Sequence, residues 1–216
     1  MRQPPGTLAR YTTAARINHW ITAACLILLA LSGMALFHPA LFFLSALFGG
    51  GAGTRAIHPW FGSVLLVSFA ILFIRFARHN LWTGDDNRWI GSIGRVLAND
   101  EEHVPEVGRY NAGQKLVFWL MTLLILVLFV TGLVIWDTYF FGYTTIEQKR
   151  IAQLLHSLAA VAIIGVWIVH VYAALWVRGS VQAMTRGNVT AGWSWRHHRK
   201  WLRERAESTT GPHAVD

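Results

Sequence analysis

The stretch LLHSLAAVAIIGVWIVHVYAALWV (residues 154–177) decides the fold of this chain. It contains no Asp, Glu, Lys or Arg, and it exceeds the roughly 20 apolar residues that cross about 30 Å of hydrocarbon. Two histidines interrupt it, His156 and His170, which are about 3.9 helical turns apart. They therefore lie on nearly the same face of one membrane helix, roughly 21 Å apart along its axis.

Three more apolar stretches of similar length precede this one. The chain has 216 residues, of which 54% are hydrophobic and 14% are charged, a composition that excludes an ordinary soluble domain. None of its acidic residues lies in the four apolar stretches. We expect an all-α integral membrane protein, a single membrane domain over residues 1–216 with a bundle of four transmembrane helices at about 17–37, 55–77, 114–136 and 150–177.

Basic residues are distributed unequally between the expected loops. Only Arg55, Lys149 and Arg150 fall in the two loops on one side, and the other sixteen lysines and arginines fall in the N-terminal segment, the middle loop and the tail over 178–216. The positive-inside rule therefore places both termini and the middle loop in the cytoplasm. The same distribution explains the net charge of +8 without nucleic acid.

The single cysteine, Cys25, lies inside the first apolar stretch. The chain therefore has neither a disulfide framework nor the C-x-x-C-H motif that attaches a c-type haem. The first stretch is too long for a cleaved signal peptide and lacks a convincing cleavage site. The absence of acids from the spans also argues against an ion or solute transporter.

Four histidines fall inside the expected spans, where an ionisable side chain usually marks function. His19 and His170 belong at the cytoplasmic side of their helices, and His58 and His156 at the outer side. Pairing by depth predicts two b-type haems, each with two imidazole ligands: an inner haem iron on His19 and His170, and an outer one on His58 and His156. For any one of these histidines alone, a hydrogen bond to a carbonyl is the more ordinary role.

Two arginines precede expected ligands by three residues, Arg16 before His19 and Arg55 before His58. At that spacing they project from the same helix face, one turn nearer water. They are candidates for binding haem propionates. Positive-inside anchoring is the alternative, and it explains Arg16 better than Arg55.

The other six histidines fit a haem less well. His79 is the strongest rival, but it lies about 31 Å along the helix from His58 and so near cytoplasmic water. His197 and His198 could bind a metal ion, although the adjacent basic residues oppose a cation. The remaining three lie beyond helix ends or in polar segments: His38, His103 and His213.

The start of the third expected helix carries the polar sequence GRYNAGQK (residues 108–115). Asn111 has the features of a helix cap. The alternative is that Asn111, Gly113 and Gln114 line a quinone pocket, with amides binding a carbonyl oxygen and Gly113 allowing close approach. A quinone reduced there takes its protons from the cytoplasm.

Shorter segments connect these helices. Residues 86–98 follow an amphipathic stripe and are expected to lie on the cytoplasmic surface. Residues 40–48 are too short to span and are expected at the outer interface. The glycines of 49–53 predict a flexible turn, because no strand precedes them as a phosphate-binding loop requires. Trp193, Trp195 and Trp201 in the tail suit the headgroup region.

Several of these strings resemble the cytochrome b556, or gamma, subunit of membrane-bound respiratory formate dehydrogenase. The strings that match are RINHWIT (16–22), IHP (57–59), GRYNAGQK (108–115), LHSLAA (155–160), HVYAALWV (170–177) and His197-His198. The likeness covers most of the chain and is looser at the N-terminus and in the outer loops. Ala112 lies where relatives carry a bulkier residue, which bears on quinone preference.

The resemblance implies two haem b groups on the four histidines named above and a menaquinone or ubiquinone site near the inner haem. It implies a bacterial cytoplasmic membrane location, with a molybdenum or tungsten catalytic (alpha) subunit and an iron–sulfur (beta) subunit as partners, in a complex that can form a higher oligomer. In that family, electrons from formate pass through the iron–sulfur subunit to the outer haem, the inner haem and then quinone.

Formate oxidation itself is not expected of this chain, because it has no thiolate cluster and no molybdopterin-sized soluble domain. Two alternatives keep the four histidines and change the electron donor. They are a cytochrome b subunit of a nickel–iron hydrogenase and a stand-alone quinone-linked dihaem cytochrome b.

Overall fold

The computed structural model describes residues 6–98, 100 and 103–210. The chain forms two compact units. The bundle unit comprises Ile17–Arg75 and Trp119–Val171, and the terminal unit comprises Met1–Arg16, Phe76–Phe118 and Tyr172–Asp216. His213 and Arg2, one of the basic residues of the N-terminal segment, lie outside the described residues.

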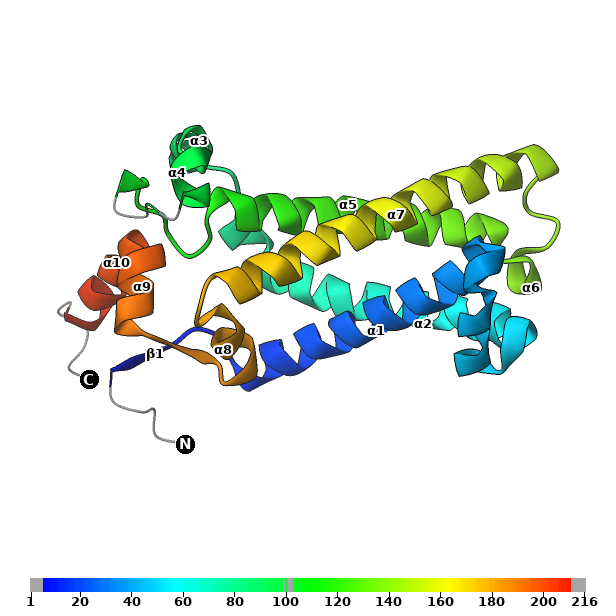
Figure 1. The fold of residues 1–216 in the computed structure, drawn as a ribbon, viewed down its shortest axis with the longest axis horizontal. Helices are drawn as coiled ribbons and strands as arrows, with labels where there is room; N and C mark the ends of the chain where they lie inside the picture. The colour runs from blue at the N-terminus through cyan, green and yellow to red at the C-terminus, as the bar shows by residue number, and fades with distance from the viewer. Residues whose placement is uncertain (1–5, 99, 101–102, 211–216) are drawn as a thin grey trace. The chain divides into compact units, whose positions relative to one another are not determined.

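Four long helices dominate the fold (Figure 1), and all are apolar and long enough to cross a membrane. They are α1 (Thr13–Phe37), α2 (Gly50–Phe76), α5 (Ala112–Ile135) and α7 (Ile146–Trp176). The expectation of a helical protein with four apolar membrane helices is confirmed. Each helix begins earlier than its expected span. At α1, α5 and α7, a polar residue just before the apolar run caps a free N–H group. At α7, for example, Thr145 and Gln148 cap each other's backbone N–H groups.

The core of the bundle unit is narrow. Each long helix supplies one residue to its buried cluster: Cys25, Leu65, Ile125 and Ile163. Much of the apolar surface is exposed, as at Val67 (63%). An apolar surface this extensive is compatible with lipid and not with water.

Hydrogen bonds from polar side chains join α1 to α2 inside this apolar bundle. The Asn18 amide donates to the Ser68 carbonyl at 2.9 Å, and the Ser68 hydroxyl donates to Asn18 Oδ1 at 2.8 Å. The Thr22 and Ser68 hydroxyls are 2.7 Å apart. Such bonds hold membrane helices together because no water competes for the polar groups.

A 3-10 helix, η1 (Pro39–Phe48), leads into α2. The flexible turn expected over 49–53 is wrong, since α2 begins at Gly50. Gly49 and Gly50 adopt φ values of 79° and 80°, which favour glycine. A Cβ at Gly53 would lie 2.0 Å from the Phe48 carbonyl oxygen. The glycines thus allow a tight reversal. The other expected outer loop contains the short α6 (Asp137–Phe140).

The terminal unit brings the two ends of the chain together. Strand β1 (Thr7–Ala9) pairs antiparallel with β2 (Asn188–Thr190), with Leu8 opposite Val189. The other elements of this unit are η2 (Ala77–Asn80), α3 (Gly84–Gly91), α4 (Ile93–Leu97), α8 (Ser180–Thr185), α9 (Ala191–His197) and α10 (Arg199–Thr210).

Tryptophans of the tail form part of the terminal unit's core. Trp193 and Trp201 are buried with Ala183 and Val189, whereas Trp195 is 58% exposed. The Arg10 guanidinium lies 4.9 Å from the Trp193 ring and 4.8 Å from the Trp201 ring. The electron-rich faces of the two rings attract the Arg10 guanidinium and shield it from water. The expectation that Trp193 and Trp201 lie among headgroups is therefore wrong, because both rings bind this arginine.

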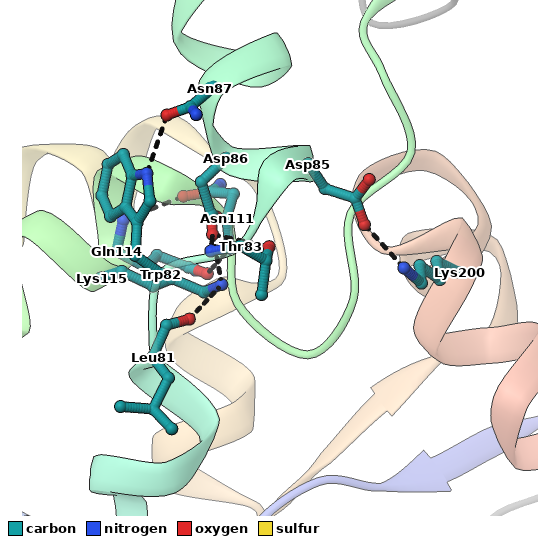
Figure 2. A network of polar contacts seen from close by, with 10 residues as sticks. All are labelled: Leu81, Trp82, Thr83, Asp85, Asp86, Asn87, Asn111, Gln114, Lys115 and Lys200. Carbon is teal, nitrogen blue, oxygen red and sulfur yellow. Dashed lines mark hydrogen bonds and ion pairs between the residues drawn. The ribbon is translucent and has the colours of Figure 1, made fainter.

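The expected amphipathic segment over 86–98 divides into α3 and α4 at Ser92. Figure 2 shows how α3 is attached to the start of α5. Lys115 Nζ lies 2.7 Å from Asp86 Oδ2 and donates to the Leu81 carbonyl at 3.0 Å. Thr83 donates to the same carboxylate from its backbone N–H and its hydroxyl, at 2.7 and 2.8 Å. This ion pair is almost completely buried.

Candidate functional site

The bundle unit brings the four membrane histidines together in two pairs. The His19 ring on α1 lies 6.3 Å from the His170 ring on α7, measured between centroids. The His58 ring on α2 lies 6.3 Å from the His156 ring, also on α7. These are the pairs that were expected from depth in the membrane. Helix α7 thus supplies one member of each pair, at positions roughly 21 Å apart along its axis.

The spacing within each pair suits a metal ion between two imidazoles. Imidazole nitrogen binds a transition metal at about 2 Å, which puts the two ring centroids of a linear bis-imidazole site about 6 Å apart. Both observed separations have this value. The donor set is chemically suitable as well, because imidazoles on both axial positions bind haem iron.

Hydroxyl groups accompany the His58–His156 pair. Ser32 Oγ on α1 lies 2.7 Å from His58 Nδ1, and Thr131 Oγ1 on α5 lies 2.9 Å from His156 Nδ1. The pair at His19 differs, since His19 Nδ1 is buried with no hydrogen-bond partner in the part of the chain that the structure describes.

Known proteins are similar to this chain in sequence over most of its length. The family model for prokaryotic cytochrome b561 matches residues 10–187. The formate dehydrogenase cytochrome b556(fdo) subunit of Escherichia coli is 45% identical over 203 residues, covering 94% of this chain and 95% of that protein. The cytochrome b556(Fdn) subunit of the nitrate-inducible enzyme from the same species is 40% identical, covering 88% and 87%.

The Haemophilus influenzae formate dehydrogenase cytochrome b556 subunit is 38% identical, covering 91% of this chain and 83% of that protein. The chain belongs to this family of cytochrome b556 subunits. It is accordingly a b-type cytochrome of the prokaryotic cytochrome b561 group.

The two arginines of this b556 subunit occupy different surroundings. Arg16 donates to the Thr185 carbonyl and, at 3.0 Å, to the Thr13 hydroxyl, while its buried Nε has no partner among the described residues. Arg55 lines a cavity of about 380 Å³ together with His38 and Phe42. Each arginine thus retains a donor or an accessible charge that an anionic group could use.

The start of α5 is a reciprocal cap. The Gln114 N–H donates to Asn111 Oδ1 at 2.9 Å, and the Asn111 N–H donates to Gln114 Oε1 at 3.1 Å. The cap uses the oxygen of each amide and leaves the NH2 groups out of the motif. A Cβ at Gly113 would lie 3.2 Å from the Trp89 ring, so the close approach that this glycine permits is made by Trp89 of α3.

Among the remaining histidines, His198 and His79 belong to the terminal unit. His198 is 1% exposed; its Nδ1 lies 2.8 Å from the Gly108 carbonyl oxygen, and its Nε2 lies 3.4 Å from Arg10 Nη2. Burial and the nearby Arg10 charge lower the pKa of His198 to about 3. The described residues contain no cluster of three or more His, Cys, Asp or Glu side chains suited to a metal ion. His79 Nδ1 is also buried without a partner among those residues.

Sequence reasoning missed Ser32 and Thr131. The available signal was a hydroxyl residue followed by glycine within an apolar run, Ser32-Gly33 and Thr131-Gly132. A Cβ at either glycine would lie 3.5 Å from the Cε1 atom of the adjacent histidine. Which histidine each hydroxyl contacts depends on the packing of helices distant in sequence, and so the pattern alone was not interpretable.

Proposed function

We propose that this chain is the dihaem cytochrome b subunit of a formate dehydrogenase and carries electrons across the membrane to a quinone. The observation that carries the proposal is the presence of two histidine pairs, each with 6.3 Å between ring centroids, on three of the four apolar helices. The names of the family members support formate dehydrogenase as the complex.

The histidines are the proposed iron ligands, His19 and His170 for an inner haem b and His58 and His156 for an outer one. When bound, haem supplies a one-electron redox couple that the protein itself lacks. The helices exclude water and lower the dielectric around each pair, which tunes the haem potential. Arg16 and Arg55 supply positive charge to balance the haem propionates.

The quinone site is proposed at the start of α5. The Asn111 and Gln114 NH2 groups donate to a quinone carbonyl oxygen there, while their oxygens keep the helix capped. Arg10 and Arg109 add positive charge to the same terminal unit. The site is proposed to face the cytoplasm, from which reduction draws its protons.

The proposed partners are a catalytic subunit that oxidises formate and an iron–sulfur subunit that delivers the electrons. The proposed location is the bacterial cytoplasmic membrane, with both termini inside. The apolar faces of α1, α2, α5 and α7 suit lipid contact there.

The test is a haem assay and a reduced-minus-oxidised spectrum of the complex in its native membranes, with formate as reductant. We expect two b haems per chain, both reduced by formate. His156→Ala should remove the outer haem and His170→Ala the inner one, because each loses an axial ligand. Full retention of both haem signals in either variant contradicts the ligand assignment. If two haems are present but formate does not reduce them, the electron donor of this chain is another enzyme, such as a hydrogenase.

A further inference from the structure

The two hydroxyls next to His58 and His156 occupy equivalent positions in the bundle unit. Each belongs to a neighbouring helix, Ser32 on α1 and Thr131 on α5, and each is followed by a glycine beside the histidine ring. Both are buried, with Ser32 0% and Thr131 7% exposed. Two separate helices thus present the same hydroxyl–glycine pair to a proposed outer ligand.

The hydrogen bonds of each hydroxyl determine which ring nitrogen carries the proton. Ser32 Oγ donates to the Leu28 carbonyl at 2.7 Å, and Thr131 Oγ1 donates to the Val127 carbonyl at 2.6 Å. A hydroxyl has one proton, and a carbonyl can only accept. The hydroxyl oxygens must therefore accept from the rings, which makes Nδ1 of His58 and of His156 the protonated nitrogen.

A neutral imidazole protonated on Nδ1 keeps its free lone pair on Nε2. Nε2 is then the atom available to iron. Hydrogen bonding at the opposite nitrogen fixes the tautomer and the ring orientation of a metal-bound histidine and makes the ligand more basic. A more basic ligand stabilises ferric over ferrous iron and so lowers the reduction potential.

The His19–His170 pair provides the internal contrast. His19 Nδ1 is buried and has no hydrogen-bond partner in the described part of the chain. The His19 ring therefore lacks a hydrogen-bond acceptor of the kind that lies beside His58 and His156, and this ligand differs from them in a property that sets a haem potential.

We propose that Ser32 and Thr131 are positioning residues that hold His58 and His156 as Nδ1-protonated ligands and lower the potential of the outer haem relative to the inner one. This inference rests on the proposed function. The transfer that it favours moves one electron from ferrous iron at the outer site to ferric iron at the inner site, with no proton. The hydroxyls thereby favour electron transfer in the inward direction.

The test is a spectroelectrochemical titration of the purified complex, with the outer haem identified by its absence from His156→Ala. Ser32→Ala and Thr131→Val remove the hydroxyls and add no bulk. Each should raise the reduction potential of the outer haem by about 59 mV. For one electron, that shift corresponds to a tenfold change in the oxidised-to-reduced ratio at a fixed potential. The inner-haem potential should not move.

Two control variants separate this role from general packing. Thr131→Ser keeps the hydroxyl and should retain the wild-type potential. Ser63→Ala removes a hydroxyl that bonds to the Pro59 carbonyl on α2, and it should also leave both potentials unchanged. A second result also supports the positioning role. In that result, Thr131→Val loses the outer haem, Thr131→Ser keeps it, and the reduction potential of the inner haem is unchanged in both variants.

The contradicting results are distinct for the two proposals. Two haems with unchanged potentials in Ser32→Ala and Thr131→Val overturn this inference and leave the proposed function intact. A wild-type complex that contains no haem, or one, contradicts the proposed function itself.

Discussion

At the scale of single residues, the adjacent aspartates Asp85 and Asp86 each pair with a lysine, but the two ion pairs differ in burial (Figure 2). The Lys115–Asp86 pair is buried, whereas the Lys200 side chain in its pair with Asp85 is 49% exposed. Burial would raise the pKa of Asp86, but hydrogen bonds from Lys115 and Thr83 outweigh it and the pKa is lowered. Asp86 is therefore an anion whose burial depends on Lys115.

Lys115→Met should destabilise the protein by about 3–5 kcal/mol, because it leaves a buried carboxylate without its cation. Lys200→Met is the matched control and should cost about 0–1 kcal/mol, since water reaches the partly exposed Asp85, which also keeps its ion pair with Arg88. Thermal unfolding of the detergent-solubilised protein measures both. Equal losses of stability in the two variants would show that burial of the Lys115 pair carries no special weight.

At the scale of the helix, the N-terminus of α5 combines a cap with the proposed quinone contact. Asn111→Ala removes the cap, at a cost of about 1 kcal/mol, and also the NH2 donor. Asn111→Ser keeps a good capping oxygen and removes only the donor. We expect both variants to keep two haems and to reduce quinone more slowly. Steady-state quinone reduction with formate measures this, and a wild-type rate in Asn111→Ser would leave Asn111 as a helix cap alone.

Secondary structure was predictable for the long helices because their signal is local. An apolar run such as residues 154–177 has one stable form in hydrocarbon, a helix that satisfies its own backbone. The start of α7 lies outside that run, since Thr145 and Gln148 cap it in polar sequence. The break between α3 and α4 was not predictable, because the periodicity of apolar residues continues across Ser92.

Some tertiary contacts could be predicted from the sequence and others could not. The histidine pairs followed from helix direction and depth, which topology restricts to few choices. The contacts of Arg10 with Trp193 and Trp201 did not, because they join residues almost a full chain length apart and tryptophan among arginines is also typical of a headgroup region. Ser32 and Thr131 were missed because their contacts with the histidines depend on how separate helices pack.

At the scale of the whole molecule, the proposed electron path requires one orientation in the membrane. An even number of crossings puts the tail and the middle loop on one side and the loop between α5 and α7 on the other. Cys25 is the single cysteine of the chain, so Cys25→Ala gives a cysteine-free background. Exposed positions are available for single cysteines in each segment: Ser208, Ala98 and Tyr143.

In that background, Tyr143→Cys should react with a membrane-impermeant maleimide in intact cells, whereas Ala98→Cys and Ser208→Cys should react only after the membrane is permeabilised. The physical reason is that sixteen of nineteen basic residues belong to the segments expected to be retained inside. Labelling is read from the mass of the purified chain. Labelling of Ser208→Cys in intact cells would show that the orientation is the reverse of the proposed one. The His58–His156 pair would then lie at the cytoplasmic side, where it could not accept electrons from formate oxidised outside.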